Sequence, residues 1–226
     1  MKLIIFDCDG TIVDSQHAIV AAMNEGFAAH GFDAPKRQDV LGVVGLSLVE
    51  AVDRLLPDEH RLEAAVPVAE SYKVAFAALR RQPGHNEPLF QGALETISEL
   101  RARDDVLLGI ATGKSRRGVD ALFEREGLHD HFATIQTADD HPSKPHPSMI
   151  EQAMMDCGVE ADQTVMIGDT TFDMDMARAA GVPALGVTWG YHPREFLLEA
   201  GADELVDEYE HVPAALWRLL KVDGGQ

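Results

Sequence analysis

The sequence has little of what marks secreted or membrane proteins. Only two of its 226 residues are cysteine, so it carries no disulfide framework and suits a reducing compartment. No stretch approaches the length of a transmembrane helix. The N-terminal apolar run, Leu3 to Phe6, is too short for a signal peptide. We therefore expect a soluble, cytoplasmic protein.

Basic residues are also scarce. There are 19 lysines and arginines against 38 aspartates and glutamates, and the formal net charge is -19. A surface this acidic argues against nucleic acid or an anionic membrane as a partner. A small anionic substrate remains possible, because a local metal ion or lysine can dominate the electrostatics of a site.

The sequence leaves the oligomeric state open between a monomer and a homodimer.

One stretch, Ile4-Ile5-Phe6-Asp7-Cys8-Asp9-Gly10-Thr11, organises the chain. The apolar run shows no alternation, which is typical of a strand buried on both faces. Because side chains on a strand alternate, Asp7 and Asp9 point to the same side and Cys8 to the other. Open α/β sheets bind ligands where such strands end. Two carboxylates this close repel each other unless a cation or a shared proton relieves them, so this stretch predicts a site.

Helical patterning without a convincing strand follows from residue 15 to residue 81. Asp14 or Ser15 is expected to cap its first helix and Ser47 a later one. Pro67 interrupts the apolar spacing after residue 58, which favours two abutting helices. Breakers cluster at residues 82–88. We expect a helical cap at 15–81 over a core of 1–14 and 82–226, with hinges at residues 14–15 and 82–88.

Beyond this cluster, strands and helices alternate. Strands are expected at residues 106–111, 132–137, 164–167, 183–188 and 204–206, with helices at 93–103, 115–126, 147–157, 171–180, 195–199 and 212–220. Such alternation indicates a parallel sheet wound on both faces. The predicted fold class is α/β, a Rossmann-like, doubly wound parallel sheet core with an inserted all-helical cap domain.

Further polar groups fall where the predicted strands end. Thr112-Gly113-Lys114 closes the second strand, Lys144 lies in the loop after the third, and Asp169 and Asp173 follow the fourth. One sheet edge would therefore collect several carboxylates, a hydroxyl and an ammonium. Carboxylates without clustered histidine or cysteine favour Mg²⁺ over Zn²⁺.

These groups suit phosphoryl transfer. The hydroxyl of Thr112, backbone N–H groups at Gly113 and the ammonium of Lys144 could cradle a phosphate. A metal ion and a lysine would neutralise the charge of the transferring group. One carboxylate can attack phosphorus and form an aspartyl-phosphate, while a second moves the proton. For Asp173, stabilisation of a helix N-terminus is an equal alternative.

Four segments of the chain resemble, in their order and rough spacing, the four motifs of haloacid dehalogenase-like (HAD) hydrolases. These segments are Asp7-Cys8-Asp9-Gly10-Thr11, Thr112, Lys144, and Gly168-Asp169 with Asp173. The helical insert resembles the cap of subfamily I, and the nearest group is the phosphoglycolate phosphatases and phosphoglucomutases. The resemblance covers nearly the whole chain.

The resemblance implies a role for each site residue. Asp7 would be the nucleophile and Asp9 the general acid and base, with Lys144 and Thr112 on the phosphoryl oxygens. Mg²⁺ would be held by Asp7, Asp169 and the backbone carbonyl of Asp9. Asp173 would lie just outside the metal ligands and orient either those ligands or Lys144.

One position departs from the family pattern. The second motif usually has asparagine where this chain has Gly113. The phosphate cradle would then have backbone donors only at that position. This departure bears on how the substrate fits more than on the class of reaction.

The predicted activity is a Mg²⁺-dependent phosphatase acting on a small phosphorylated metabolite, such as phosphoglycolate, a sugar phosphate, a nucleotide or pyrophosphate. A sugar-phosphate mutase shares all four motifs. A 2-haloacid dehalogenase would need neither Asp9 nor a metal, and a phosphonatase would need a Schiff-base lysine in the cap, where only Lys36 and Lys73 occur. A non-catalytic binding module on the same scaffold is the alternative from another class.

Overall fold

A six-stranded parallel sheet forms the centre of the molecule in the computed structural model, which describes residues 1–82 and 87–221. The strand order is β3-β2-β1-β4-β5-β6. All pairs between neighbouring strands are parallel. The strands are β1 (Lys2–Phe6), β2 (Val106–Thr112), β3 (Thr134–Thr137), β4 (Thr164–Gly168), β5 (Ala184–Val187) and β6 (Glu204–Val206).

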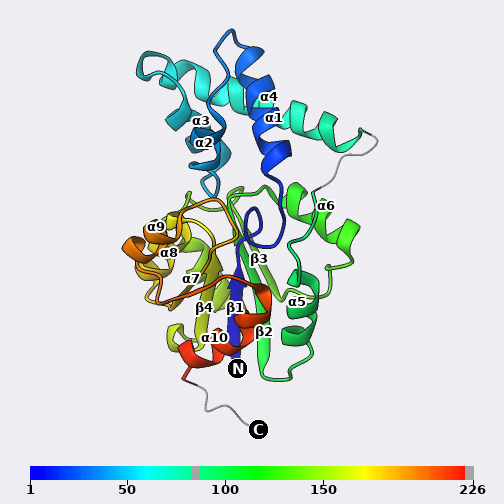
Figure 1. The fold of residues 1–226 in the computed structure, drawn as a ribbon, viewed down its shortest axis with the longest axis vertical. Helices are drawn as coiled ribbons and strands as arrows, with labels where there is room; N and C mark the ends of the chain where they lie inside the picture. Colours follow the sequence, from blue (N-terminus) through cyan, green and yellow to red (C-terminus); the bar gives the residue numbers. More distant parts are fainter. Residues whose placement is uncertain (83–86, 222–226) are drawn as a thin grey trace.

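Helices cover both faces of this sheet (Figure 1). One face packs against α5 (Ala93–Arg101), α6 (Arg116–Glu126) and α10 (Val212–Leu219). The other packs against α7 (Ser148–Cys157), α8 (Thr171–Ala180) and α9 (Arg194–Ala200). The doubly wound α/β fold class predicted from the sequence is confirmed.

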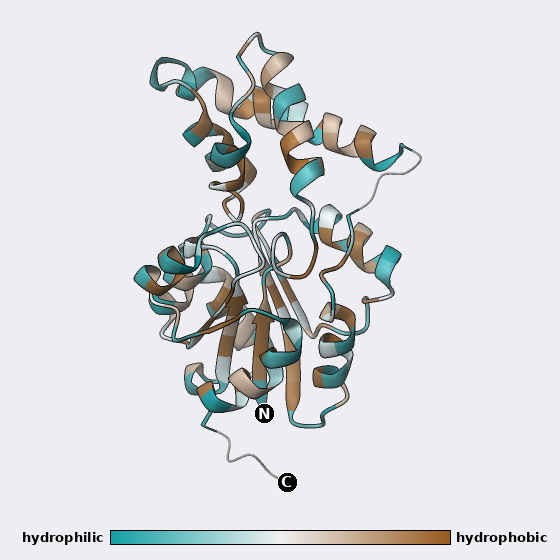
Figure 2. Ribbon diagram, in the orientation of Figure 1, coloured by the Kyte–Doolittle hydropathy of each residue, from teal (hydrophilic) through white to brown (hydrophobic). Residues whose placement is uncertain are grey.

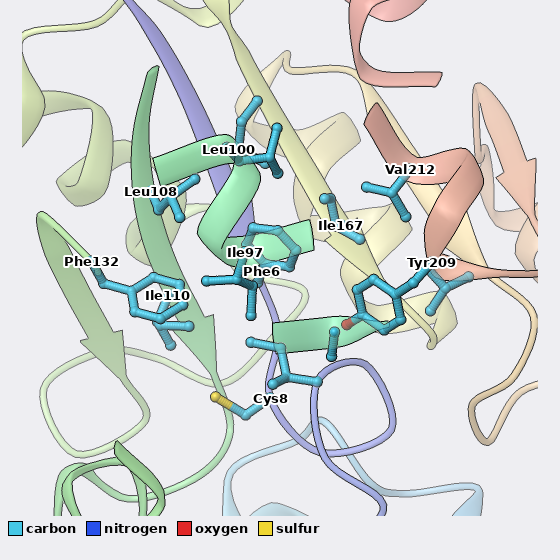
Figure 3. Packing of buried hydrophobic residues seen from close by; sticks show 14 of the residues in the cluster. Phe6, Cys8, Ile97, Leu100, Leu108, Ile110, Phe132, Ile167, Tyr209 and Val212 are labelled. Atoms are coloured by element: carbon cyan, nitrogen blue, oxygen red, sulfur yellow. The ribbon is translucent and has the colours of Figure 1, made fainter. Parts of the chain in front are cut away.

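The central strand β1 explains the apolar run at the start of the sequence. Ile4 and Phe6 belong to the hydrophobic cluster on one face of the sheet, and Leu3 and Ile5 belong to the cluster on the other. All four side chains are fully buried. Figure 2 shows the strands as the apolar centre between more polar helices. Cys8 is fully buried in the same hydrophobic cluster as Phe6 (Figure 3).

A separate group of helices lies beyond the carboxyl ends of the strands (Figure 1). We call it the helical layer; it comprises α1 (Gln16–Ala28), α2 (Arg37–Leu41), α3 (Leu48–Leu55), a 3₁₀ turn (Asp58–His60) and α4 (Arg61–Arg80). The layer has a hydrophobic cluster of its own, centred on residues such as Phe27, Val52 and Val68. Its position places helices over the strand ends where the sequence predicts a site.

Two local predictions in this layer are wrong. Residues 61–80 form the single helix α4 with Pro67 inside it. Pro67 and Glu63 are exposed, so water can bond the carbonyl that the proline leaves without a donor. The side chain of Ser47 makes no cap hydrogen bond to α3. Of the two residues expected to cap α1, Ser15 instead donates its hydroxyl to Asp9, whereas Oδ1 of Asp14 accepts a hydrogen bond from the N–H of Gln16 at 3.4 Å.

The linker predicted at residues 82–88 falls partly on residues 83–86, outside the described part of the chain. Within the described part, none of the helices combines the length and the apolar character that crossing a membrane requires.

Candidate active site

The ends of two adjacent strands bring three of the predicted carboxylates together. Asp7 follows β1, and Asp169 and Asp173 follow β4. Carboxylate oxygens of these three residues lie within 4.8 Å of one another, and all three residues are buried. The N–H of Asp7 donates to the carbonyl of Ile167 at 2.9 Å, which fixes the two strand ends beside each other.

Lys144 brings a positive charge into this carboxylate cluster. Its Nζ lies 2.6 Å from Oδ1 of Asp173 and 3.1 Å from Oδ1 of Asp7, and the side chain is fully buried. Burial disfavours the charged ammonium, but the attraction of Asp173 and Asp7 outweighs burial and raises the pKa of Lys144. Lys144 therefore stays protonated beside the carboxylates.

Asp7 lies at the point where the cluster meets an open cavity. Its Oδ1 accepts a 2.7 Å hydrogen bond from the N–H of Cys8. Its Oδ2 is buried and has no hydrogen-bond partner among the described residues. Burial raises the pKa of Asp7 to about 6, with Lys144 opposing that shift and Asp173 adding to it. The carboxyl therefore combines a raised pKa with one oxygen that makes no hydrogen bond among the described residues.

Asp169 is held on both of its oxygens. Oδ1 accepts from the hydroxyl of Thr11 at 2.8 Å, and Oδ2 accepts from the N–H of Tyr191 at 2.9 Å. Gly10 lets the backbone approach this closely, since a Cβ there would lie 2.2 Å from Oδ2 of Asp169 and its φ is +86°. Burial, with repulsion from Asp173 and Asp7, raises the pKa of Asp169 well above its usual value.

Asp173 fulfils both of the roles that the sequence left open. Its Oδ2 accepts from the N–H of Thr170 at 3.0 Å and closes a capping box at the start of α8. Its Oδ1 accepts from Lys144. One carboxylate thus ends up both fixing a helix start and orienting the buried lysine.

The carboxylate of Asp9 stands apart from the three-carboxylate cluster and faces different partners. Its Oδ1 accepts from the hydroxyl of Ser15 and, at 2.6 Å, from Nζ of Lys114. Sequence reasoning did not assign Lys114 to the site. The available signal was its place in the second motif, directly after Thr112 and Gly113, where a lysine is usual in the resembling family.

Thr112 and Gly113 lie beside Asp7 and Asp9 in the wall of the same cavity. The hydroxyl of Thr112 accepts from the N–H of Lys114 at 3.2 Å, and it also favours the ionised form of Asp7. Gly113 meets the helical layer: a Cβ there would lie 2.5 Å from the carbonyl oxygen of Leu46 and 2.6 Å from that of Gly45. The layer's backbone thus occupies the space that a side chain at position 113 would need.

The donor set of the cluster fits a hard divalent cation. Three buried carboxylates face one lysine, so the cluster carries excess negative charge. The unpartnered Oδ2 of Asp7 supplies a free ligand atom of the kind that Mg²⁺ prefers. No histidine or cysteine is part of this cluster as the described residues form it. The residues present therefore fit Mg²⁺ better than Zn²⁺.

A doubly wound sheet with an acidic, lysine-bearing site at its strand ends and a helical layer above it defines a class of α/β enzymes. The family model of "Haloacid dehalogenase-like hydrolase" matches residues 4–187. The chain belongs to this family. Together with its named relatives, this makes it a hydrolase of the phosphatase type.

Several relatives match almost from end to end. The chain is 36% identical to "Probable phosphatase IndB" of Dickeya dadantii, over 97% of this chain and 95% of that protein. It is 30% identical to a phosphoglycolate phosphatase of Agrobacterium fabrum, over 98% and 95% of the two chains. A hydrolase from Pseudomonas syringae superposes with a TM-score of 0.83 at 25% identity, covering 96% of this chain and 99% of that one.

Proposed function

We propose that the protein is a Mg²⁺-dependent phosphatase that hydrolyses a small phosphorylated metabolite through an aspartyl-phosphate on Asp7. The observation that carries this proposal is the state of Asp7. Asp7 has one carboxylate oxygen without a hydrogen-bond partner among the described residues, lines the cavity and sits beside a buried lysine. A carboxylate in this setting is suited to attack phosphorus.

The reaction then runs in two displacements. A carboxylate oxygen of Asp7 bonds to phosphorus, the bond from phosphorus to the leaving oxygen breaks, and Asp9 gives that oxygen a proton. Water next attacks phosphorus, Asp9 takes its proton, and the acyl phosphate bond breaks to return Asp7 and release inorganic phosphate. Lys144, the hydroxyl of Thr112 and the N–H groups at Gly113 bind phosphoryl oxygens throughout.

Asp7, Asp169 and the backbone carbonyl of Asp9 would hold the Mg²⁺. When bound, the ion neutralises charge on the phosphoryl oxygens. Asp173 stays outside this ligand set in the proposal; one of its oxygens accepts from Lys144 and the other from the start of α8. It acts as a positioning residue for the lysine.

The helical layer would act as the cap of the active site. In this proposal residues 15–81 form the cap domain, and residues 1–14 and 82–226 form the core. Support comes from the separate hydrophobic cluster of the layer and from the cavity between it and the strand ends. A closed cap would exclude water from the phosphoryl group during the first displacement.

Replacement of the nucleophile tests the proposal. Asp7→Asn should reduce Mg²⁺-supported hydrolysis of p-nitrophenyl phosphate to the background rate, because an amide oxygen is a poor nucleophile. The matched control is Asp175→Asn, a half-buried carboxylate of α8 that pairs with Arg178 outside the cluster, which should keep full activity. Circular dichroism checks that both variants fold. Full activity of Asp7→Asn would reject the mechanism, and activity that survives EDTA would favour the dehalogenase alternative.

A further inference from the structure

The cavity above Asp7 is large for a phosphatase of very small metabolites. It has a volume of about 710 Å³, within the roughly 300–1,000 Å³ typical of pockets for drug-sized ligands. Asp7, Asp9 and Thr112 lie in its wall at the strand ends. The phosphoryl group of a substrate would occupy that end only, so most of the volume is left for the leaving group.

The rest of the wall is mainly apolar and comes from the helical layer. The side chains that α1, α2, α4 and the loop after α2 contribute include Ile19, Met23, Val40, Val44, Tyr72 and Phe76. Tyr72 and Phe76 lie one helical turn apart on α4, with ring centroids 5.6 Å apart. A leaving group with an apolar body would displace water from this wall, which favours binding in proportion to the area covered.

The cations near this wall are largely committed to carboxylates of the protein itself. Lys114 pairs with Asp9 at 2.6 Å. Lys73 pairs with Glu70 at 2.7 Å. Arg80 pairs with Glu87 at 3.1 Å. The other two arginines of the wall, Arg81 and Arg117, are exposed to solvent. The wall next to the phosphoryl end therefore offers apolar surface more than free positive charge to the leaving group.

We infer that the substrate is a phosphomonoester with a bulky, largely apolar leaving group of at least ring size, and that α4 selects it. The inference rests on the proposed phosphatase function. It differs from a preference for a two-carbon acid such as phosphoglycolate, which would leave most of the apolar wall in contact with water.

The test compares substrates whose leaving groups have similar intrinsic reactivity. Ethyl phosphate and 2-phenylethyl phosphate both release a primary alkanol, so the chemical step is matched and only the size of the leaving group differs. With Mg²⁺, the full-length protein should hydrolyse 2-phenylethyl phosphate with a kcat/KM at least about tenfold higher, as expected for burial of a phenyl ring. Equal values, or a higher kcat/KM for 2-phosphoglycolate, would overturn the inference.

Two adjacent alanines on α4 supply matched variants. Ala77 lines the cavity, whereas Ala78 is exposed to solvent. Ala77→Leu should narrow the cavity and lower the ratio of the two kcat/KM values several-fold, as loss of a fitted apolar contact predicts. Ala78→Leu should keep the wild-type ratio. The inference fails if both variants change the ratio equally, or if neither does.

Binding without turnover separates this inference from the proposed function. Calorimetry in Mg²⁺ should show 2-phenylethylphosphonate binding about tenfold more tightly than ethylphosphonate, and Ala77→Leu should weaken only that preference. If neither phosphate is hydrolysed but the preference is present, the proposed function fails while the cavity assignment stands. Equal affinity of the two phosphonates overturns the assignment.

Discussion

Two lysines of the site form ion pairs with different carboxylates. Lys144 lies between Asp7 and Asp173, on the side of the proposed metal and phosphate. Lys114 contacts Asp9, on the side of the leaving group. Through this division the two aspartates at the end of β1 meet different electrostatic surroundings although they are only two residues apart. Different surroundings are what a nucleophile and a proton donor require.

Lys114 is expected to hold the carboxylate of Asp9 in position. Lys114→Met should lower kcat for p-nitrophenyl phosphate by roughly tenfold to a hundredfold, because Asp9 loses the ammonium that holds its carboxylate in place. Steady-state kinetics measures the effect on kcat and KM. The control Lys36→Met alters an exposed lysine with no described role. An unchanged kcat in Lys114→Met would contradict a positioning role for this lysine.

The end of β2 and the helical layer are in direct contact. Gly113 lies against the carbonyls of Gly45 and Leu46. Nearby, the N–H of Ser47 donates to the hydroxyl of Ser143 at 2.8 Å. The departure from the usual asparagine therefore has a steric counterpart, since the backbone of the layer fills that space. This link could not be predicted from either segment alone.

Substitution of Gly113 tests this contact. Gly113→Ala and Gly113→Asn should each push the layer away from the phosphate cradle and lower kcat/KM by about tenfold or more, since catalysis is sensitive to displacements of about 1 Å. Gly42→Ala is the matched control, because a Cβ there would make only ordinary contacts, the nearest at 3.4 Å. Higher activity in Gly113→Asn would show instead that the missing amide limits the cradle.

The charge balance of the buried cluster acts on the stability of the whole molecule. The pKa values of Asp7 and Asp169 are raised by burial first and by neighbouring carboxylates next. A carboxyl whose pKa is higher in the folded state binds more protons there than in the unfolded chain, so its contribution to stability falls as pH rises. For Asp7 that loss spans the range from the usual aspartate pKa of 3.8 to its raised pKa of about 6.

Thermal unfolding with and without Mg²⁺ measures this effect. We expect Mg²⁺ to raise the Tm at pH 7.5, and to raise it less at pH 5, where protonation already relieves part of the repulsion. Asp169→Asn should raise the Tm of the metal-free protein and remove most of the response to Mg²⁺. Ca²⁺-free buffer with EDTA defines the baseline. A Tm that Mg²⁺ does not change at either pH would argue against a metal site here.

The sequence by itself determined the layers, the sheet and the meeting of Asp7, Thr112, Lys144 and Asp169. It could do so because buried parallel strands have a distinct apolar pattern and their carboxyl ends share one edge. Only the tertiary structure decided the pairing of Lys114 with Asp9, the continuous helix through Pro67, the closeness of Gly113 to the helical layer and the apolar cavity. These features depend on distances between segments far apart in the chain and on which atoms reach water, and neither is encoded in local spacing.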